Sequence, residues 1–213
     1  MKFLIAAFLF SQMAFAKGIC DFPVPPFQIE EHQTTGIDRH AYDHVLDQVE
    51  KKYVKVFFDM GYRFSLHRSW SDGTVNAQAW WSGNTCHVEI FGGLARYPGI
   101  SAAAIRQVTL HEIGHCIGGA PFYPGENMSC EGQADYYSAV VGCKNLKVGC
   151  RNSSKNLARA LAKMAGEPKP WRPGPPLPEV NWTYCEHPDA QCRLNTFDAG
   201  LLGDPRPRCW FKP

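Results

Sequence analysis

Residues 101–118 of the chain read SAAAIRQVTLHEIGHCIG, and this stretch decides how the middle of the fold is built. Ser101 can cap a helix, because a serine side chain at this position accepts a hydrogen bond from a backbone N–H of the first turn. Two glycines at positions 118 and 119, followed by Pro121, are typical of a helix end. The sequence therefore predicts a helix from Ser101 to about Ile117.

The same stretch contains His111-Glu112-Ile113-Gly114-His115, a His-Glu-x-x-His pattern. Residues i and i+4 lie one turn apart on the same helix face, so both imidazoles can reach one metal ion. Glu112 then lies beside the metal, where it can accept a proton from a bound water. The alternative is a solvated helix whose two histidines bind nothing.

A second motif, Glu131-Gly132-Gln133-Ala134-Asp135, follows His115 by sixteen residues and opens the next predicted helix. Glu131 and Asp135 are again i and i+4. One carboxylate can complete a His, His, Glu ligand set, while the other accepts the second N–H of a ligand imidazole. Three protein ligands leave the fourth zinc position to water, as in catalytic sites. In isolation the two carboxylates would more often be a surface pair, but their place after the first motif favours the metal site.

Around these motifs the sequence predicts an α+β domain. Apolar residues at helical spacing predict an N-terminal helix over residues 38–58. Three β-rich stretches separated by turn residues predict an antiparallel meander over residues 62–70, 74–81 and 86–94. Further helices are expected at residues 129–141, 154–165 and 188–202. The order helix, strands, helices is that of an α+β fold.

The composition is that of one globular domain. The 213 residues include 22 Lys+Arg and 20 Asp+Glu, and 45% are hydrophobic, so no nucleic-acid partner is expected. No later apolar run is long enough to cross a bilayer, which argues against integral membrane association. No oligomerisation signal stands out, so a monomer is expected. The expected division is a signal peptide (1–16), an extended arm (17–37), a metallopeptidase core (38–165), a Pro/Gly-rich linker (166–180) and a C-terminal segment near the active site (181–213).

The first sixteen residues are typical of a secretory signal peptide. Lys2 precedes an apolar stretch over residues 3–10, and Ala14-Phe15-Ala16 matches a cleavage site. The sequence therefore predicts cleavage after Ala16 and a secreted or periplasmic protein. Residues 17–19 do not match the small-residue pattern that precedes a lipid-attached cysteine, which disfavours a lipoprotein. Whether residues 17–37 are a removable pro-segment stays open.

Nine cysteines in an exported chain predict disulfides, and the odd number leaves at least one thiol outside any pairing within the chain. The pairings considered are the local loops Cys143–Cys150 and Cys185–Cys192, a Cys116–Cys130 bond between the two motif helices, and Cys20–Cys86. For Cys116 the alternative, slightly favoured, is a buried unpaired thiol.

Taken together, the motifs resemble those of the gluzincin zinc metallopeptidases. Their order is similar to that in the family containing the CAAX prenyl endopeptidases, the membrane protease HtpX and the periplasmic protease-chaperone BepA. The segments that carry this resemblance are Asn76-Ala77-Gln78-Ala79, Gly92-Gly93-Leu94, the two motifs above, and His187-Pro188 followed by Arg193. The chain departs from that family in having no transmembrane helices, many more cysteines and a bulky Trp80-Trp81 pair.

The resemblance implies a small zincin-like fold, with the His-Glu-x-x-His helix and a following helix that carries the glutamate ligand. It also implies one Zn²⁺ per chain, held by His111, His115 and Glu131. Glu112 would be the general base of metal-assisted amide hydrolysis, and Asp135 would orient His111.

The resemblance implies further roles outside the metal ligands. Asn76 and Ala77 would lie on an edge strand that binds the substrate backbone by β-addition. His187 would be a catalytic-site residue that approaches the metal in a self-inhibiting switch, and Arg193 would stabilise the oxyanion or anchor that loop. The alternative is that His187 is an ordinary residue at a helix start and Arg193 a surface ion-pair partner.

These observations favour a secreted zinc endopeptidase acting on protein or peptide substrates. One alternative is a catalytically silent or self-inhibited binding or chaperone module, although such a module has no need of Glu112. Another is a zinc amidase that acts on cell-wall peptides.

Overall fold

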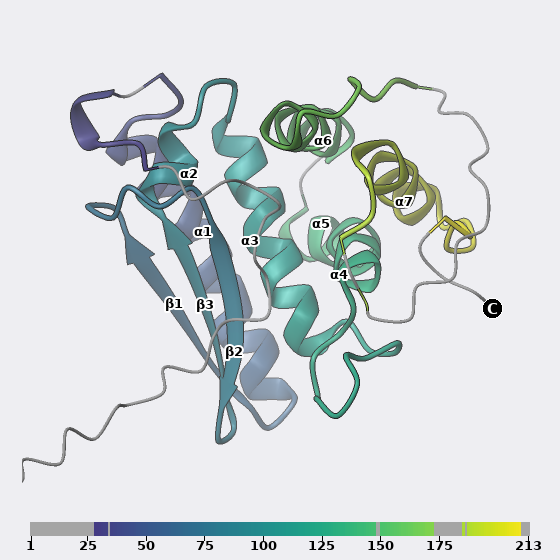
Figure 1. The fold of residues 1–213 in the computed structure, drawn as a ribbon. Coiled ribbons are helices and arrows are strands. Elements are labelled where there is room, and N and C mark those ends of the chain that lie inside the picture. The colour runs from purple at the N-terminus through teal and green to yellow at the C-terminus, as the bar shows by residue number, and fades with distance from the viewer. Residues whose placement is uncertain (1–27, 34, 148–149, 173–184, 186, 210–213) are drawn as a thin grey trace, which may run out of the picture.

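A three-stranded sheet occupies one side of the molecule and a group of helices the other (Figure 1). The structure is a computed structural model, and it describes residues 28–33, 35–147, 150–172, 185 and 187–209. The predicted signal peptide and Cys20 lie outside the described residues, as do residues 173–180 of the predicted linker.

The sheet has the strand order β1-β3-β2. Strand β1 (Arg63–Ser69) runs parallel to β3 (Thr85–Phe91), while β2 (Ala77–Ser82) runs antiparallel to β3. The three predicted strands are therefore present and the α+β class is confirmed, but the meander is wrong. The two-residue turn at Gly83-Asn84 makes a hairpin of β2 and β3, whereas the longer connection over residues 70–76 takes β2 to the far edge of the sheet.

Strand β3 also ends three residues earlier than predicted, because Gly92 begins a short helix, α2 (Gly92–Arg96). A Cβ atom at Gly92 would lie 1.8 Å from the carbonyl oxygen of Trp70. Only glycine allows the two backbones to pass this closely, so the chain turns away from the sheet here.

Helix α1 (Arg39–Asp59) packs against β1 and α3 and confirms the first predicted helix. Asp38 caps it, because its Oδ1 accepts a hydrogen bond from the backbone N–H of Ala41 at 2.8 Å. A 3-10 turn, η1 (Glu31–Gln33), precedes this helix. The apolar stripe of α1 is buried as its spacing predicts, at Tyr42, Val45, Leu46, Val49, Tyr53 and Phe57.

Helix α3 (Ala102–Ile117) is the central element, with α1 and β2 on one side and α4 and α6 on the other (Figure 1). Its predicted cap is confirmed, since Ser101 Oγ accepts from the backbone N–H of Ala104 at 3.1 Å. Every residue from Gln107 to Cys116 is buried. The helix therefore carries His111 and Glu112 into the interior rather than to the surface.

Helix α4 (Glu131–Tyr137) does not stop at Gly142 as predicted. It continues through a π-helical turn, η2 (Ser138–Gly142), into α5 (Cys143–Leu146). A Cβ atom at Gly142 would lie 3.2 Å from the side chain of Leu110, so this glycine makes a helix contact instead of a helix end. The last two predicted helices are present as α6 (Arg151–Ala165) and α7 (Ala190–Leu202).

Four disulfides lie within the described residues. Cys143–Cys150 was predicted and is confirmed. The expected pairings Cys185–Cys192, Cys116–Cys130 and Cys20–Cys86 are wrong, and so is the expectation of an unpaired Cys116. Cys116 lies where α3 meets β3, and Cys192 lies where α7 meets the C-terminal segment, so each has a different partner within reach. The bonds present there are Cys86–Cys116, Cys130–Cys185 and Cys192–Cys209. Four disulfides indicate an oxidising environment.

Among the described helices, none combines the length and apolar character needed to cross a bilayer.

Candidate metal centre

A close contact between α3 and α4 brings the two sequence motifs together. A Cβ atom at Gly114 would lie 2.9 Å from both the Cα atom and the carbonyl oxygen of Ala134. Glycine at position 114 therefore allows α4 to lie directly on the helix that carries the two histidines. Residues Glu131 and Asp135, on either side of Ala134, are placed against His111 and His115 as a result.

Three side chains converge at this contact, and we call them the His/Glu cluster: His111, His115 and Glu131. His111 Nε2 lies 3.0 Å from Glu131 Oε2, and His115 Nε2 lies 3.5 Å from Glu131 Oε1. The two Nε2 atoms are 3.0 Å apart. All three side chains are buried, and their ligand atoms lie within 4.8 Å of one another. The cluster can hold a metal ion.

Both histidine rings turn Nε2 into the cluster because Nδ1 is held from outside. The carboxylate Oδ1 of Asp135 accepts a hydrogen bond from His111 Nδ1 at 2.7 Å, as the family resemblance implied. The backbone carbonyl of Ser129 accepts one from His115 Nδ1 at 2.7 Å. Such outer partners fix the tautomer and the ring orientation of a metal ligand. The role of Ser129 carries no sequence signal, since a backbone carbonyl is common to every residue.

Arg193, on α7, completes a chain of contacts behind His111. Its Nε and Nη2 atoms donate to the two carboxylate oxygens of Asp135, each at 2.8 Å. The guanidinium is almost fully buried. The surface ion-pair alternative for Arg193 is therefore wrong, and the structure places this side chain behind Asp135 as its partner.

His187 lies at the cluster, as the resemblance implied. Its Nε2 is 3.1 Å from Glu131 Oε2, the same oxygen that His111 approaches. The residue precedes α7, whose cap is Asp189. The Cys130–Cys185 disulfide joins the residue before Glu131 to the segment that carries His187.

Tyr123 is a site residue that sequence reasoning missed. It lies in the loop between α3 and α4, and its hydroxyl donates to Glu131 Oε1 at 2.8 Å. Glu131 thus has a tyrosine on one oxygen and two histidines near the other. The sequence indicates only that Tyr123 lies between the two motifs, and this position does not predict a contact with Glu131.

The buried charges shift the pKa values of the cluster in opposite directions. Burial lowers the pKa of His111, but Asp135 and Glu131 outweigh it and raise that pKa to about 10. Burial lowers the pKa of His115 to about 4, with His111 adding to the effect. Burial raises the pKa of Glu131, but His187, His115 and His111 together hold it well below its usual value. The cluster therefore favours an ionised Glu131 and a neutral His115.

The remaining predicted residues lie on elements next to the cluster. Glu112 is fully buried on α3, between the two histidines in sequence. Ala77 is the first residue of β2, an edge strand that packs against α3, and Asn76 directly precedes that strand. The Asn76 side-chain oxygen accepts a hydrogen bond from the backbone N–H of Ala77 at 2.9 Å, which shapes the entry into the strand.

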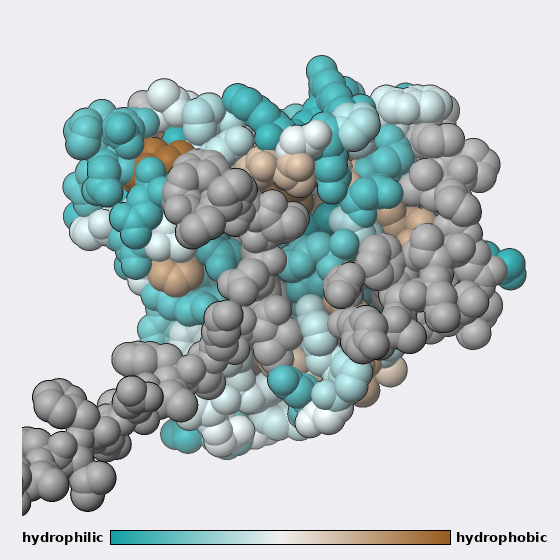
Figure 2. Space-filling view, in the orientation of Figure 1, coloured by the Kyte–Doolittle hydropathy of each residue, from teal (hydrophilic) through white to brown (hydrophobic). Residues whose placement is uncertain are grey.

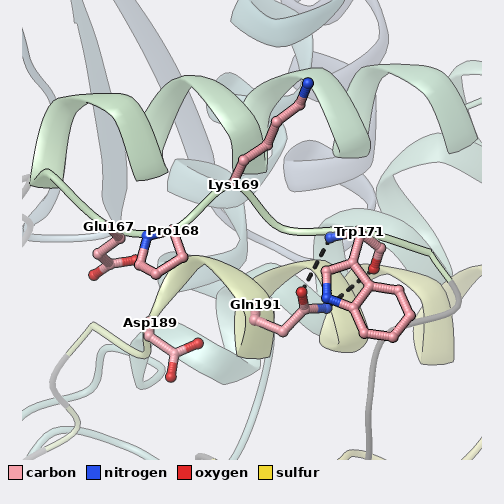
Figure 3. A pocket seen from close by; sticks show the side chains of 6 residues that line it. All are labelled: Glu167, Pro168, Lys169, Trp171, Asp189 and Gln191. Atoms are coloured by element: carbon pink, nitrogen blue, oxygen red, sulfur yellow. Dashed lines mark hydrogen bonds between the residues drawn. The ribbon is translucent and has the colours of Figure 1, made fainter.

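A separate cavity of about 330 Å³ lies where α6 leads toward α7 (Figure 3). Its two carboxylates are engaged at the start of α7, since Glu167 accepts from the backbone N–H of Ala190 and Asp189 accepts from that of Cys192. None of its lining residues belongs to the His/Glu cluster. They are Glu167, Pro168, Lys169, Trp171, Asp189 and Gln191.

No protein-family model, curated protein or solved structure matches this chain.

Proposed function

We propose that the protein is a secreted zinc metalloendopeptidase of gluzincin type. The observation that supports this proposal is the convergence of His111, His115 and Glu131, with Asp135 holding the outer nitrogen of His111. Two histidines, or two carboxylates, at i and i+4 on one helix could arise for other reasons. A buried ligand set whose rings are already oriented is much harder to explain by structural packing alone.

Zinc is the metal that suits this donor set best. Two imidazole nitrogens and one carboxylate oxygen match the ligands of catalytic zinc sites, which keep the fourth position open. A bound zinc ion would polarise the scissile carbonyl and lower the pKa of its water. Histidine must be neutral to bind. The low pKa of His115 meets this condition at neutral pH, whereas His111, with a pKa of about 10, would lose a proton as the metal binds.

Glu112 is the proposed general base. It follows His111 directly and is fully buried, so its carboxylate belongs to the same water-poor environment as the ligands. In this role Glu112 accepts a proton from the attacking water and later gives it to the leaving amine. The substrate backbone would lie along β2, whose outer edge has no neighbouring strand in the described sheet.

Three variants test the proposal. Wild-type protein should contain about one zinc per chain by elemental mass spectrometry and should cleave an unfolded protein substrate. Glu112→Gln should keep the zinc and lose at least about 100-fold in turnover, in line with typical general-base contributions. Glu131→Ala should lose the zinc, whereas Glu126→Gln, a change at an exposed glutamate, should alter neither property.

Wild-type-like turnover in Glu112→Gln would remove that residue from the mechanism. Absence of metal after zinc has been supplied would mean that the cluster is not a zinc site. Digestion of purified peptidoglycan, in place of unfolded protein, would favour the cell-wall amidase.

The contact between His187 and Glu131 supports a second candidate, a metallopeptidase that holds itself inactive. His187 Nε2 lies 3.1 Å from a ligand oxygen, which is close enough to compete for the open position. If so, His187→Ala should cleave the unfolded substrate faster than wild type at equal zinc content. Slower cleavage by that variant would instead give His187 a part in the reaction.

A further inference from the structure

The end of α1 exposes large apolar side chains that no described part of the chain covers. The tip patch, as we call it, consists of Val54, Phe58, Met60 and Tyr62, whose exposed fractions are 49%, 76%, 49% and 39%. These are four of the seven large hydrophobic residues that are exposed in the described part of the chain. By contrast, the face shown in Figure 2 is mostly hydrophilic, with small and separate hydrophobic areas.

The tip patch is built on rigid structure. The end of α1, the start of β1 and the β2–β3 turn lie at the same end of the molecule (Figure 1). The backbone N–H of Arg63 donates to the carbonyl of Asn84 in that turn at 2.9 Å. The Tyr62 ring packs 5.1 Å from the ring of Trp81, which in turn contacts buried Phe57. These contacts therefore hold Tyr62 and the start of β1 in place beside the end of α1.

Basic residues surround these apolar side chains. Lys51 and Lys55 are four residues apart, as are Val54 and Phe58, and Val54 follows Lys51 by three, so the four side chains share one helix face. Asp59 is the one acidic residue among residues 51–63, and its carboxylate is bound by Lys55 Nζ at 2.9 Å.

The charges at this end of the molecule are positive overall. Just before Lys51 in the chain, Asp47 and Glu50 share a single cation, Arg68, and so offset one positive charge. Residues 51–63 carry four cations, Lys51, Lys52, Lys55 and Arg63, against the single carboxylate of Asp59, whereas the whole chain has a formal charge of only +2.

We propose that the tip patch binds the surface of an anionic lipid bilayer. Apolar side chains that alternate with lysines on one helix face are typical of interfacial binding, because the rings enter the acyl boundary while the ammonium groups stay at the headgroups. Lysine is depleted at protein–protein interfaces, so the exposed lysines beside these apolar side chains favour a bilayer over a protein partner. The inference is independent of the metal centre.

Vesicle flotation with the purified chain tests this inference. Vesicles of phosphatidylcholine and phosphatidylglycerol in equal parts should bind the protein, and pure phosphatidylcholine vesicles should bind it at least tenfold more weakly. Binding should fall as salt is raised, because exposed charges are screened. Removal of bound metal with EDTA should leave binding unchanged.

Variants separate the apolar contribution to vesicle binding from the electrostatic one. Phe58→Ser should weaken binding by about tenfold, since it removes one inserted ring. Lys51→Gln with Lys52→Gln should weaken it by roughly 25-fold, because each basic residue near an anionic surface contributes about fivefold. The matched controls are Leu202→Ser, at a residue that is 74% exposed, and Lys169→Gln, at an exposed lysine. Both should bind as wild type does, and all variants should unfold at similar temperatures.

Three results would overturn the inference. One is the absence of binding to the anionic vesicles. Another is an equal loss of binding in the control variants. The third is a wild-type dimer in sedimentation that Phe58→Ser converts to a monomer without any vesicle binding, since the tip patch would then join two copies of the chain.

Discussion

At the scale of single residues, the His/Glu cluster depends on groups that would not touch a bound metal. Asp135 and the Ser129 carbonyl each hold one histidine Nδ1, and Arg193 holds Asp135. Burial raises the pKa of Asp135, but Arg193 and His111 lower it below its usual value, so this carboxylate stays ionised. The ligand rings are thus oriented before any ion arrives.

Tyr123 should contribute to metal affinity through Glu131. Its hydroxyl donates to Glu131 Oε1 at 2.8 Å and restricts the rotation of that carboxylate. We expect Tyr123→Phe to weaken zinc binding by about 10- to 100-fold, as is typical for outer partners of metal ligands. Competition with a chelator of known affinity measures the change. Tyr136→Phe, whose hydroxyl donates to the Asp204 carbonyl instead, should leave zinc affinity unaltered, and an equal loss there would contradict a specific role for Tyr123.

Zinc uptake should release about one proton from His111 at pH 6. Without metal the pKa of His111 is about 10, so the ring is protonated, and a metal ligand must be neutral. His115, with a pKa of about 4, is already neutral and should release none. Because His111 loses its proton unaided above its own pKa, its contribution to the release should vanish as the pH rises through about 10, whereas a zinc-bound water contributes a proton above about pH 7.

Calorimetry of zinc binding in two buffers of different ionisation enthalpy counts these protons. At pH 6 a zinc-bound water, with a pKa near 7, adds little to the count. Asp135→Asn should release fewer protons, because it removes the carboxylate that raises the pKa of His111 most. Equal release from both proteins would show that Asp135 does not control the protonation of His111.

The sequence predicted the core of the site well, and its surroundings less well. His111, His115, Glu131 and Asp135 were found because helical spacing places i and i+4 on one face, which is a local property. Tyr123 and Ser129 were not found, because their contacts depend on the path of a loop.

At the scale of elements, the site requires α3 and α4 to lie unusually close. Gly114→Ala should push them apart, since the new Cβ atom would lie 2.9 Å from the backbone of Ala134. We expect a loss of about 1–3 kcal/mol in the free energy of unfolding, as for other overpacked positions, together with weaker zinc binding. Urea unfolding of the metal-free protein measures the first effect.

Gly142→Ala is the matched control for this change. The atoms nearest to its Cβ atom would all belong to the Leu110 side chain, at 3.2 Å, and not to backbone. Alanine also has the higher helix propensity, so the two effects should nearly cancel. If both variants lost the same stability, the contact between Gly114 and Ala134 would not be special.

The helices were predicted more accurately than the sheet for a related reason. The cap at Ser101 and the apolar stripe of α1 are encoded within a few residues. The pairing of β1 with β3 depends on the path of residues 70–76, which connect β1 to β2 at the far edge of the sheet. The π-helical turn at Ser138–Gly142 depends on packing against α3 and α7. Neither leaves a periodic signal in the sequence.

At the scale of the whole molecule, disulfides connect the two sides of the fold. Cys86–Cys116 joins β3 to α3 across a separation of 30 residues, and Cys143–Cys150 closes a loop of only 7. Loop entropy predicts that removing the first bond costs about 3.5 kcal/mol of unfolding free energy and removing the second about 2.5 kcal/mol. The double variants Cys86→Ala/Cys116→Ala and Cys143→Ala/Cys150→Ala, compared by urea unfolding, test this order. The reverse order would mean that strain or residual structure outweighs chain entropy.

The Cys130–Cys185 bond makes the arrangement of the candidate metal centre depend on the redox conditions around the protein. It joins the neighbour of Glu131 to the segment bearing His187, across 55 residues of chain. In a reducing compartment those two segments would have to find each other by diffusion, whereas after oxidation they are held as neighbours. Oxidising conditions, which the four disulfides indicate, would therefore fix His187 beside Glu131, whereas reducing conditions would leave that contact to weaker interactions alone.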